Sequence, residues 1–221
     1  MPWSRYTRRG CNHYREYLLD NAKYDNHLQV KKLPLVPTYV VDIGAHIGTF
    51  SVLVKRTFPG SQTICCERCP ENIPMLSKNI RGFGKVVQAA ITYEVDLTLL
   101  NSVFPDCVSI GGSIVCHPDL LATIDKVRYW ADTRPLARKT LENVISENKL
   151  ERIDLLKLDC EDSELSILRN TTSLDKIRFI VGEWHGRNQF MDIVSTRFST
   201  WNFRIFRDGE LGLFWLENKV I

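Results

Sequence analysis

The sequence of 221 residues lacks the features that mark several large classes of protein. No apolar stretch approaches the ~20 residues that a membrane-spanning helix needs, so we expect no membrane insertion. The first eleven residues contain no apolar core of the kind that a secretory signal peptide carries. The formal net charge is only +3, and an excess this small gives no reason to expect a nucleic-acid partner.

The cysteines lack the even number and regular spacing of a disulfide framework. There are seven, and several lie inside apolar, strand-like runs, where a free cysteine packs as a small hydrophobic side chain. A reducing, cytoplasmic location is therefore the default expectation. Cys66 and Cys69 form a C-x-x-C pair, but no second ligand pair with matching spacing accompanies it, which argues against a zinc site or a redox motif.

What the sequence does contain is enough apolar material for one well-packed domain, since 44% of its residues are hydrophobic and 25% are charged. We expect this domain to span residues 38–221, after an N-terminal helical extension or cap over residues 1–37. Residues 92–138 follow a looser pattern of short strands and loops. We interpret them as an insertion beside the sheet that carries substrate contacts.

The stretch Tyr39–Phe50, YVVDIGAHIGTF, organises the rest of the domain. An apolar run rich in β-branched residues stops at Asp42 and passes into a loop with Gly44 and Gly48, which predicts a buried strand, a tight turn and a helix. In open α/β sheets, ligands bind beyond the carboxyl ends of the strands, where glycines let a ligand approach the backbone. The other interpretation is a turn whose glycines only satisfy positive φ angles.

A carboxylate downstream favours the ligand-binding interpretation. Ser61–Glu67 has the pattern of a second strand, and Glu67 lies roughly 20 residues beyond the turn, where such folds keep an acidic group for ribose hydroxyls. The turn lacks the G-x-G-x-x-G pattern of dinucleotide-binding folds, because Ala45, His46 and Ile47 follow its first glycine. This absence counts against a nicotinamide-dependent oxidoreductase.

The remainder of the chain alternates between helical and strand patterns, which predicts an α/β fold with a doubly wound, mostly parallel sheet. The predicted helices are Thr49–Phe58, Pro70–Ile80, Lys139–Asn148, Asp162–Arg169 and Arg187–Ser199. The further predicted strands are Lys85–Ile91, Arg152–Asp159 and Ile177–Glu183, followed by a hairpin pattern over Asn202–Arg207 and Leu213–Leu216.

Four ionisable residues lie at the ends of two of these strands. Asp159 and Glu161 are at the carboxyl end of the fourth strand, and Glu183 and His185 are at that of the fifth. Because the carboxyl ends of parallel strands share one edge of a sheet, we expect the four to converge beside the crevice at the glycine turn. Glu164, in the helix that follows the fourth strand, is expected to be a surface carboxylate.

Four motifs taken together resemble the FkbM-type family of class I S-adenosylmethionine-dependent methyltransferases. They are DIGAHIGTFS, CCERCPEN, IDLLKLDCEDSELSILRN and FIVGEWH, and in this order they cover Val40 to about His185. Asp162 stands where the family usually has glycine, and aspartate tolerates unusual turn conformations better than most residues. The resemblance implies a Rossmann-like, mostly parallel seven-stranded sheet with a terminal antiparallel hairpin.

The resemblance also implies a cofactor and a reaction. S-Adenosylmethionine would donate a methyl group to a hydroxyl of a small-molecule, sugar or glycan-like acceptor, with His185 or Asp159 as general base and Glu183 as a third catalytic candidate. The implied cofactor-binding residues are Asp42, Gly44, His46, Gly48, Glu67, Asp159 and Glu161. A second hypothesis assigns Asp159, Glu183 and His185, together with Glu161, to a divalent cation that orients the acceptor oxygens.

Two other classes of function stay open at this point. One is a binding module of the methyltransferase fold that has lost turnover, although the glycines and carboxylates of a cofactor site are all present. The other is the nicotinamide-dependent oxidoreductase that the glycine pattern disfavours. The pattern specifies neither the acceptor nor the oligomeric state.

Overall fold

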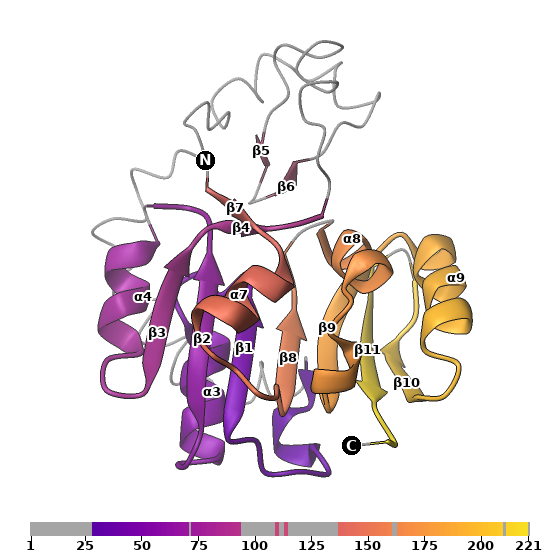
Figure 1. Ribbon diagram of the computed structural model, residues 1–221, viewed down its shortest axis with the longest axis horizontal. Helices are drawn as coiled ribbons and strands as arrows, with labels where there is room; N and C mark the ends of the chain where they lie inside the picture. The colour runs from indigo at the N-terminus through magenta and orange to yellow at the C-terminus, as the bar shows by residue number, and fades with distance from the viewer. Residues whose placement is uncertain are drawn as a thin grey trace.

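The computed structural model describes residues 28–70, 72–93, 109–110, 113–114, 137–160, 163–209 and 211–220 (Figure 1). The predicted helical cap falls mostly outside these ranges, and its described end contains the 3₁₀ turn η2 (Val30–Lys32). The predicted insertion also falls largely outside them. Its described parts include two short antiparallel strands, β5 (Ser109–Ile110) and β6 (Ser113–Ile114). Both boundaries of the central domain therefore stay predictions.

Seven strands form the central sheet, in the order β10-β11-β9-β8-β1-β2-β3 (Figure 1). Every pairing is parallel except those of β11, which runs antiparallel to both β9 and β10. The predicted mostly parallel sheet with a terminal antiparallel hairpin is thus confirmed. The strands are β1 (Tyr39–Ile43), β2 (Gln62–Glu67), β3 (Gly84–Gln88), β8 (Leu155–Leu158), β9 (Phe179–His185), β10 (Asn202–Arg207) and β11 (Leu211–Glu217).

The middle of the sheet is apolar on both faces. Val41 of β1 lies in register with Ile64 of β2 and with Leu156 of β8. All four residues of β8 are buried. Strands covered on both sides have nearly continuous apolar sequences, which explains why these strands could be identified from the sequence. Their carboxyl ends meet along one edge of the sheet, the upper edge in Figure 1.

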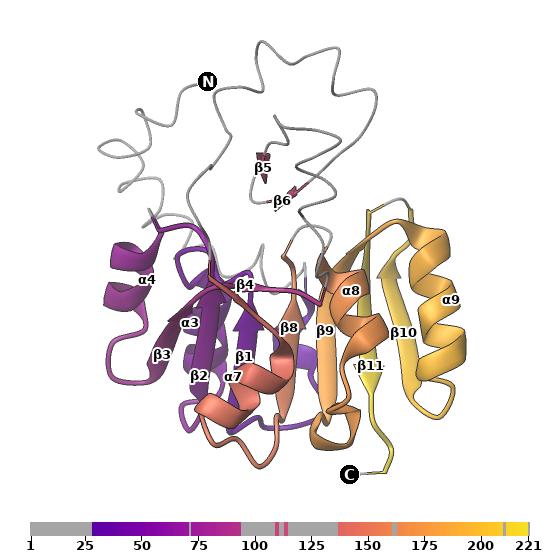
Figure 2. The ribbon, with the colours of Figure 1, turned by 45° about the horizontal axis from the view of Figure 1, so that its top comes forward.

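Helices cover the two faces of the sheet. Helix α3 (Thr49–Thr57) packs with the segment around η2 against the face that carries Val40 and Leu155. Successive residues of a strand point to opposite faces, and Val41 and Leu156 accordingly pack against the other helices. These helices are α7 (Leu141–Glu147), α8 (Ser163–Asn170) and α9 (Arg187–Arg197). Figures 1 and 2 show α7 and α8 in front of the sheet and α3 behind it, as a doubly wound fold requires.

Helix α4 (Ile73–Asn79) lies beside β3, where Leu76 and Ile80 form a small apolar cluster with Cys65. The sequence predicts that this helix starts at Pro70, three residues before it does. Of the helices in the described ranges, none has the length and apolar content needed to cross a lipid bilayer.

The predicted third strand is wrong in its second half. The sequence predicts one strand over Lys85–Ile91, but β3 ends at Gln88, and β4 (Ala90–Ile91) pairs instead with β7 (Arg138–Lys139). The Ala89 N–H donates to the Glu67 carbonyl at 3.1 Å, after which the chain leaves the central sheet.

The start of α7 shifts for a related reason. Lys139, predicted to be the first helical residue, belongs to β7, and the helix begins at Leu141. Thr140 caps it, because its hydroxyl oxygen accepts from the Asn143 N–H at 3.2 Å while the Asn143 side chain accepts from the Thr140 N–H at 2.9 Å.

Candidate functional site

The turn after β1 is built from residues with left-handed backbone conformations. Gly44, His46 and Gly48 have φ angles of 76°, 51° and 88°. The N–H groups of Gly44 and Ala45 both donate to the Cys66 carbonyl at 3.0 Å, which fixes the turn to the end of β2. The predicted strand, turn and helix are therefore all present in the order that the sequence indicates.

Neighbouring protein atoms explain why both glycines are needed. A Cβ atom on Gly44 would lie 1.9 Å from the Asp159 carbonyl oxygen, and one on Gly48 would lie 2.9 Å from a methyl carbon of Leu76. The sequence suggests that glycines let a ligand approach the backbone here. In the structure, the close approach is made by Asp159, the residue that follows β8, and by Leu76 of α4, and the positive φ angles add a second constraint.

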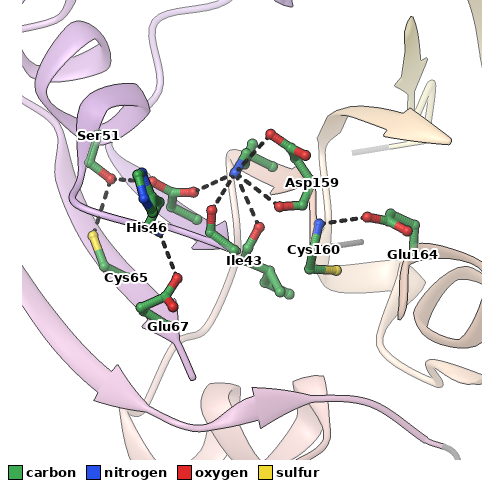
Figure 3. A network of polar contacts seen from close by, with 11 residues as sticks. Ile43, His46, Ser51, Cys65, Glu67, Asp159, Cys160 and Glu164 are labelled. Carbon is green, nitrogen blue, oxygen red and sulfur yellow. Dashed lines mark hydrogen bonds and ion pairs between the residues drawn. The ribbon is translucent and has the colours of Figure 1, made fainter. Parts of the chain in front are cut away.

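Glu67 is the last residue of β2, and its carboxylate holds the turn through hydrogen bonds (Figure 3). Its Oε2 accepts from the His46 N–H at 2.7 Å, and its Oε1 accepts from the Cys69 N–H at 2.8 Å and from the Asn72 amide at 3.2 Å. The residue is only 7% exposed. Since a carboxylate offers about four lone pairs, Glu67 keeps acceptor capacity after these bonds, beside the glycine turn.

The side chain of His46, in the middle of this turn, is exposed to solvent. Desolvation of the imidazole lowers the pKa of His46, while the charge of Glu67 opposes that change and the charge of Lys157 adds to it. Water at the exposed residue limits the lowering. A neutral imidazole at this position can accept or donate one hydrogen bond to a ligand.

Asp42 lies beneath the turn rather than at its surface, because it is fully buried. Its Oδ2 accepts from the Ser51 hydroxyl at 2.6 Å, and its Oδ1 lies 3.3 Å from the Lys157 ammonium (Figure 3). Asp42 therefore links β1, α3 and β8. Any contribution of this residue to cofactor binding would act through the shape and charge of the turn.

Lys157 is a functional candidate that the sequence analysis missed. It lies in the middle of β8 with only 3% of its side chain exposed, and its ammonium donates to the Gly44 carbonyl at 2.7 Å. Besides Asp42, its ammonium lies 3.5 Å from the Asp159 carboxylate. A buried cation is costly unless it is paired and hydrogen-bonded. A lysine inside the apolar run LLKL was the signal that could have revealed it.

Asp159 is a partly exposed residue at the carboxyl edge of the sheet. Its carboxylate is 23% exposed and lies beside the Lys157 ammonium, while its backbone carbonyl approaches Gly44. Asp159 thus joins the turn after β1 to the end of β8, as the sequence predicts. Glu161, the other predicted residue of this strand end, lies outside the described residues.

The two predicted residues of β9 have separate partners. Glu183 forms an ion pair with Arg207 of β10, and the Nδ1 of His185 lies 3.4 Å from Oε2 of Glu164. The expectation that Glu164 is a surface carboxylate is wrong, because the residue is fully buried. Its other oxygen, Oε1, accepts from the Cys160 N–H at 2.5 Å (Figure 3).

The predicted cation ligands are not gathered at one point. Within the described ranges, no group of three histidine, cysteine or acidic side chains is arranged so that it could hold a metal ion. Asp159 faces Lys157, whereas Glu183 faces Arg207. In the described part of the site, the carboxylates of Asp159 and Glu183 thus have different cationic partners.

The described cysteines form no disulfide bond with one another. Cys65, Cys66, Cys69 and Cys160 are free thiols. Burial, reinforced by the charge of Asp42, raises the pKa of Cys66 far above its usual range, so this thiol stays protonated and weakly nucleophilic.

Comparisons with known proteins agree with this geometry. The profile of the family described as "Methyltransferase FkbM domain" matches residues 42–205, well over half of the chain. The chain is 29% identical over 189 residues to methyltransferase sdnD of Sordaria araneosa, a match that covers 71% of this chain and 66% of that protein. It is 26% identical over 198 residues to 31-O-demethyl-FK506 methyltransferase FkbM of Streptomyces tacrolimicus, covering 78% and 73%. The chain thus spans about two thirds to three quarters of these relatives.

A solved structure shares the fold at low sequence identity. The METTL16 methyltransferase domain, in its second crystal form, aligns with a TM-score of 0.50 and 10% identity over 93% of this chain and 66% of that one. The strand order, the glycine turn after β1 and the profile match over residues 42–205 lead to one assignment. The chain belongs to the family of methyltransferases with an FkbM domain.

Proposed function

We propose that the chain transfers a methyl group from S-adenosylmethionine to a hydroxyl oxygen of a small-molecule, sugar or glycan-like acceptor. The observation that carries this proposal is the division of the carboxyl edge into two parts. Glu67 and the glycine turn lie at the ends of β1 and β2, and Asp159 and His185 lie at the ends of β8 and β9. The first part suits a nucleoside, and the second suits an ionisable acceptor.

The residues of the first part fit S-adenosylmethionine. A ribose presents two neighbouring hydroxyls, and Glu67 is a fixed carboxylate with acceptor capacity left after its bonds to the turn. Gly44, His46 and Gly48 shape the turn beside it, with Asp42 beneath, and Asp159 closes the opposite side. When bound, the cofactor supplies a methyl group already activated by a positively charged sulfur.

The residues of the second part have the task of aligning and deprotonating the acceptor. Holding two reactants in line can be worth about 7–11 kcal/mol of the barrier. A general base typically adds about 10²–10⁴-fold. In this proposal His185 is the base, and Asp159 accepts a hydrogen bond from the acceptor. Glu183, already paired with Arg207, is the third candidate for acceptor contacts.

Oxygen as the receiving atom is supported by one relative. The name of the Streptomyces tacrolimicus protein, 31-O-demethyl-FK506 methyltransferase, specifies O-methylation. We extend that chemistry to this chain because an imidazole at the end of β9 is suited to take the proton of a hydroxyl. The four free thiols suit a reducing compartment such as the cytoplasm, and we propose no nucleic-acid partner.

A screen with methyl-labelled S-adenosylmethionine tests the proposal. Purified protein is incubated with a panel of hydroxylated sugars, glycans and polyketides, and label is traced to oxygen, nitrogen or carbon in any product. We expect label on oxygen, with His185→Ala reducing kcat by at least about 10²-fold. Asp175→Asn, an exposed change at the amino edge of the sheet, is the control. Label on carbon or nitrogen would overturn the O-methyl assignment.

A further inference from the structure

Two carboxylates share the positive charge of Lys157. The ammonium lies 3.3 Å from Oδ1 of Asp42 and 3.5 Å from Oδ2 of Asp159 (Figure 3). It also donates to two backbone carbonyls of the glycine turn, that of Gly44 at 2.7 Å and that of Ile43 at 3.3 Å. Lys157 thus holds the turn and both acidic side chains together, and its one positive charge faces two negative ones.

The two carboxylates differ in their access to water. Asp42 is fully buried, and its other oxygen, Oδ2, accepts from the Ser51 hydroxyl at 2.6 Å. Asp159 has 23% of its side chain exposed. An ionised carboxylate is costly to bury without a cation, so Asp42 depends on the charge of Lys157, whereas water can solvate Asp159. The excess negative charge therefore lies on Asp159, at the solvent side of the turn.

The other charged groups described at this edge do not change that balance at Asp159. Arg207 pairs with Glu183, and Arg187 pairs with Asp208, so each of these pairs joins one guanidinium to one carboxylate. The imidazole of His46 adds no charge at pH 8, because desolvation lowers its pKa below the ordinary value of 6.5. Lys157 differs from both arginines in that it faces two carboxylates.

We infer that Asp159 is a specificity-determining residue, through which the site distinguishes S-adenosylmethionine from its demethylated product, S-adenosylhomocysteine, by charge. This inference rests on the proposed function. The two cofactors differ by one methyl group and by one positive charge on sulfur. A partly compensated carboxylate beside the turn attracts the positively charged sulfur more than the neutral one. Since unit charges about 8 Å apart still interact appreciably inside a protein, the effect does not require a direct contact.

Methyl transfer removes this attraction. The acceptor oxygen forms a bond to the methyl carbon as the carbon–sulfur bond breaks, and the electron pair of that bond stays on sulfur. The hydroxyl proton moves to the proposed base, His185, and from there to water. Sulfur is then neutral, while the carboxylate of Asp159 keeps its charge beside the Lys157 ammonium. The product is therefore held less tightly than the donor, and a new donor replaces it.

This role concerns binding and is separate from the acceptor contact proposed for the same side chain. The attraction acts on the bound donor, whose charge falls as the reaction proceeds, so it does not lower the barrier of the chemical step. An asparagine at position 159 lacks the charge but keeps an oxygen that can accept from the acceptor hydroxyl. Binding constants therefore report the charge of Asp159 independently of the reaction rate.

The decisive variant is Asp159→Asn, which removes the charge and keeps the shape of the side chain. Lys157 keeps its hydrogen bond to the Gly44 carbonyl, so the turn should stay in place. Asp159→Glu keeps the charge and should keep the discrimination. Asp175→Asn removes the same charge from an exposed site in the 3₁₀ turn η5 (Leu174–Lys176) and is the matched control.

Calorimetric titration at pH 8 measures the affinity of each protein for both cofactors and for an analogue that carries a protonated amine in place of the methylsulfonium group. The quantity compared is the ratio of the dissociation constant of S-adenosylhomocysteine to that of S-adenosylmethionine. A distorted turn would weaken both ligands and leave this ratio unchanged. We expect Asp159→Asn to lower the ratio about tenfold, and Asp159→Glu and Asp175→Asn to keep it within about threefold of the wild type. The amine analogue should lose affinity for Asp159→Asn as S-adenosylmethionine does.

The outcomes separate this inference from the proposed function. A ratio that Asp159→Asn leaves unchanged overturns the inference, and methyl transfer stands. An amine analogue that behaves like S-adenosylhomocysteine overturns it too, because the site then recognises the methyl group and not the charge. If the wild type binds both cofactors but methylates no hydroxylated acceptor, the proposed function fails, and the ratio still decides the role of Asp159. If the wild type binds neither cofactor, both fail.

Discussion

At the amino edge of the sheet, Asp154 is a buried carboxylate whose Oδ2 accepts from the Thr38 and Tyr39 N–H groups, both at 2.9 Å. At the carboxyl edge, Asp42 is equally buried, but its Oδ1 faces the ammonium of Lys157 at 3.3 Å. Asp154 also pairs with Arg152, but that guanidinium is largely exposed to water, whereas the ammonium that faces Asp42 is buried and donates to the glycine turn. The difference teaches that burial alone does not mark a functional carboxylate, and the nature of its partner does.

The same comparison bears on a concave region at the amino edge. The amino edge carries an open groove of about 940 Å³ lined in part by Tyr39, Gln62, Phe83 and Arg152. The Arg152 guanidinium is already paired with Asp154 at 3.0 Å and lies over the Tyr39 ring. The carboxyl edge gathers the glycine turn and the ionisable residues instead, and five predictions test this assignment.

The largest effect is expected from Lys157→Met. Removing the cation leaves the charge of Asp42 buried without compensation, which typically costs about 3–5 kcal/mol. Denaturant unfolding should show this loss, and calorimetry should show that S-adenosylmethionine binding is lost with it. Lys85→Met, at an exposed position of β3, should change neither quantity appreciably. A Lys157→Met protein as stable as the wild type would mean that the buried ion pair is not formed.

Gly44→Ala should rank next. The added methyl group would lie 1.9 Å from the Asp159 carbonyl oxygen in a turn that also needs a positive φ. Gly82→Ala is the matched control, because Gly82 has a φ of 88° but no atom within 4 Å of its Cβ position. The control should lose only the roughly 1–2 kcal/mol of a left-handed residue. Equal losses of unfolding free energy in the two variants would show that the Asp159 carbonyl does not restrict the space beside Gly44.

Asp154→Ala should lower the unfolding free energy by about 1–3 kcal/mol, since it leaves the N–H groups of Thr38 and Tyr39 without their acceptor. Its affinity for S-adenosylmethionine should stay within about twofold of the wild type. Calorimetry at a temperature where the variant is folded gives the answer. A large loss of affinity would remove the distinction between the two edges.

The smallest effect concerns Glu142, a structural carboxylate at the start of α7. Burial opposes its ionisation, but hydrogen bonds from Tyr93 and Thr171 prevail and lower the pKa of Glu142 from 4.5 to about 2. Its contribution to stability is therefore present above pH 4.5 and is lost as the pH falls toward 2. Glu142→Gln should be less stable at pH 7 and less sensitive to acid across that range. Parallel stability curves for the two proteins would contradict this.

The fold could be predicted from the sequence because its central strands, such as β1 and β8, are buried on both faces and the turn after β1 carries glycine. The break between β3 and β4 could not, because Ala89 is as apolar as Ala90 and Ile91, which follow it, and only its hydrogen bond to Glu67 shows where the chain leaves the sheet. Strand periodicity finds runs of residues, and it does not show which strand each run will join.

The candidate site could be predicted only where its residues end strands. Asp42, Glu67 and Asp159 follow from that rule. Lys157 lies inside a strand, where a pattern of apolar residues hides it. Glu164 was assigned to the surface because its partner, His185, is 21 positions away in the chain, and only the packing of α8 beside β9 brings them together.

Calorimetric titration of S-adenosylmethionine into the wild type and Glu67→Ala, with NAD as the control ligand, tests the central claim most directly. Glu67 also fastens the turn, so the melting temperature of each protein is measured beside its affinity, and Asp154→Ala supplies a variant destabilised at the other edge. We expect the wild type to bind S-adenosylmethionine but not NAD, and Glu67→Ala to bind at least about tenfold more weakly, which is about 1.4 kcal/mol. Unchanged affinity in Glu67→Ala, or a wild type that binds NAD instead, would contradict the account.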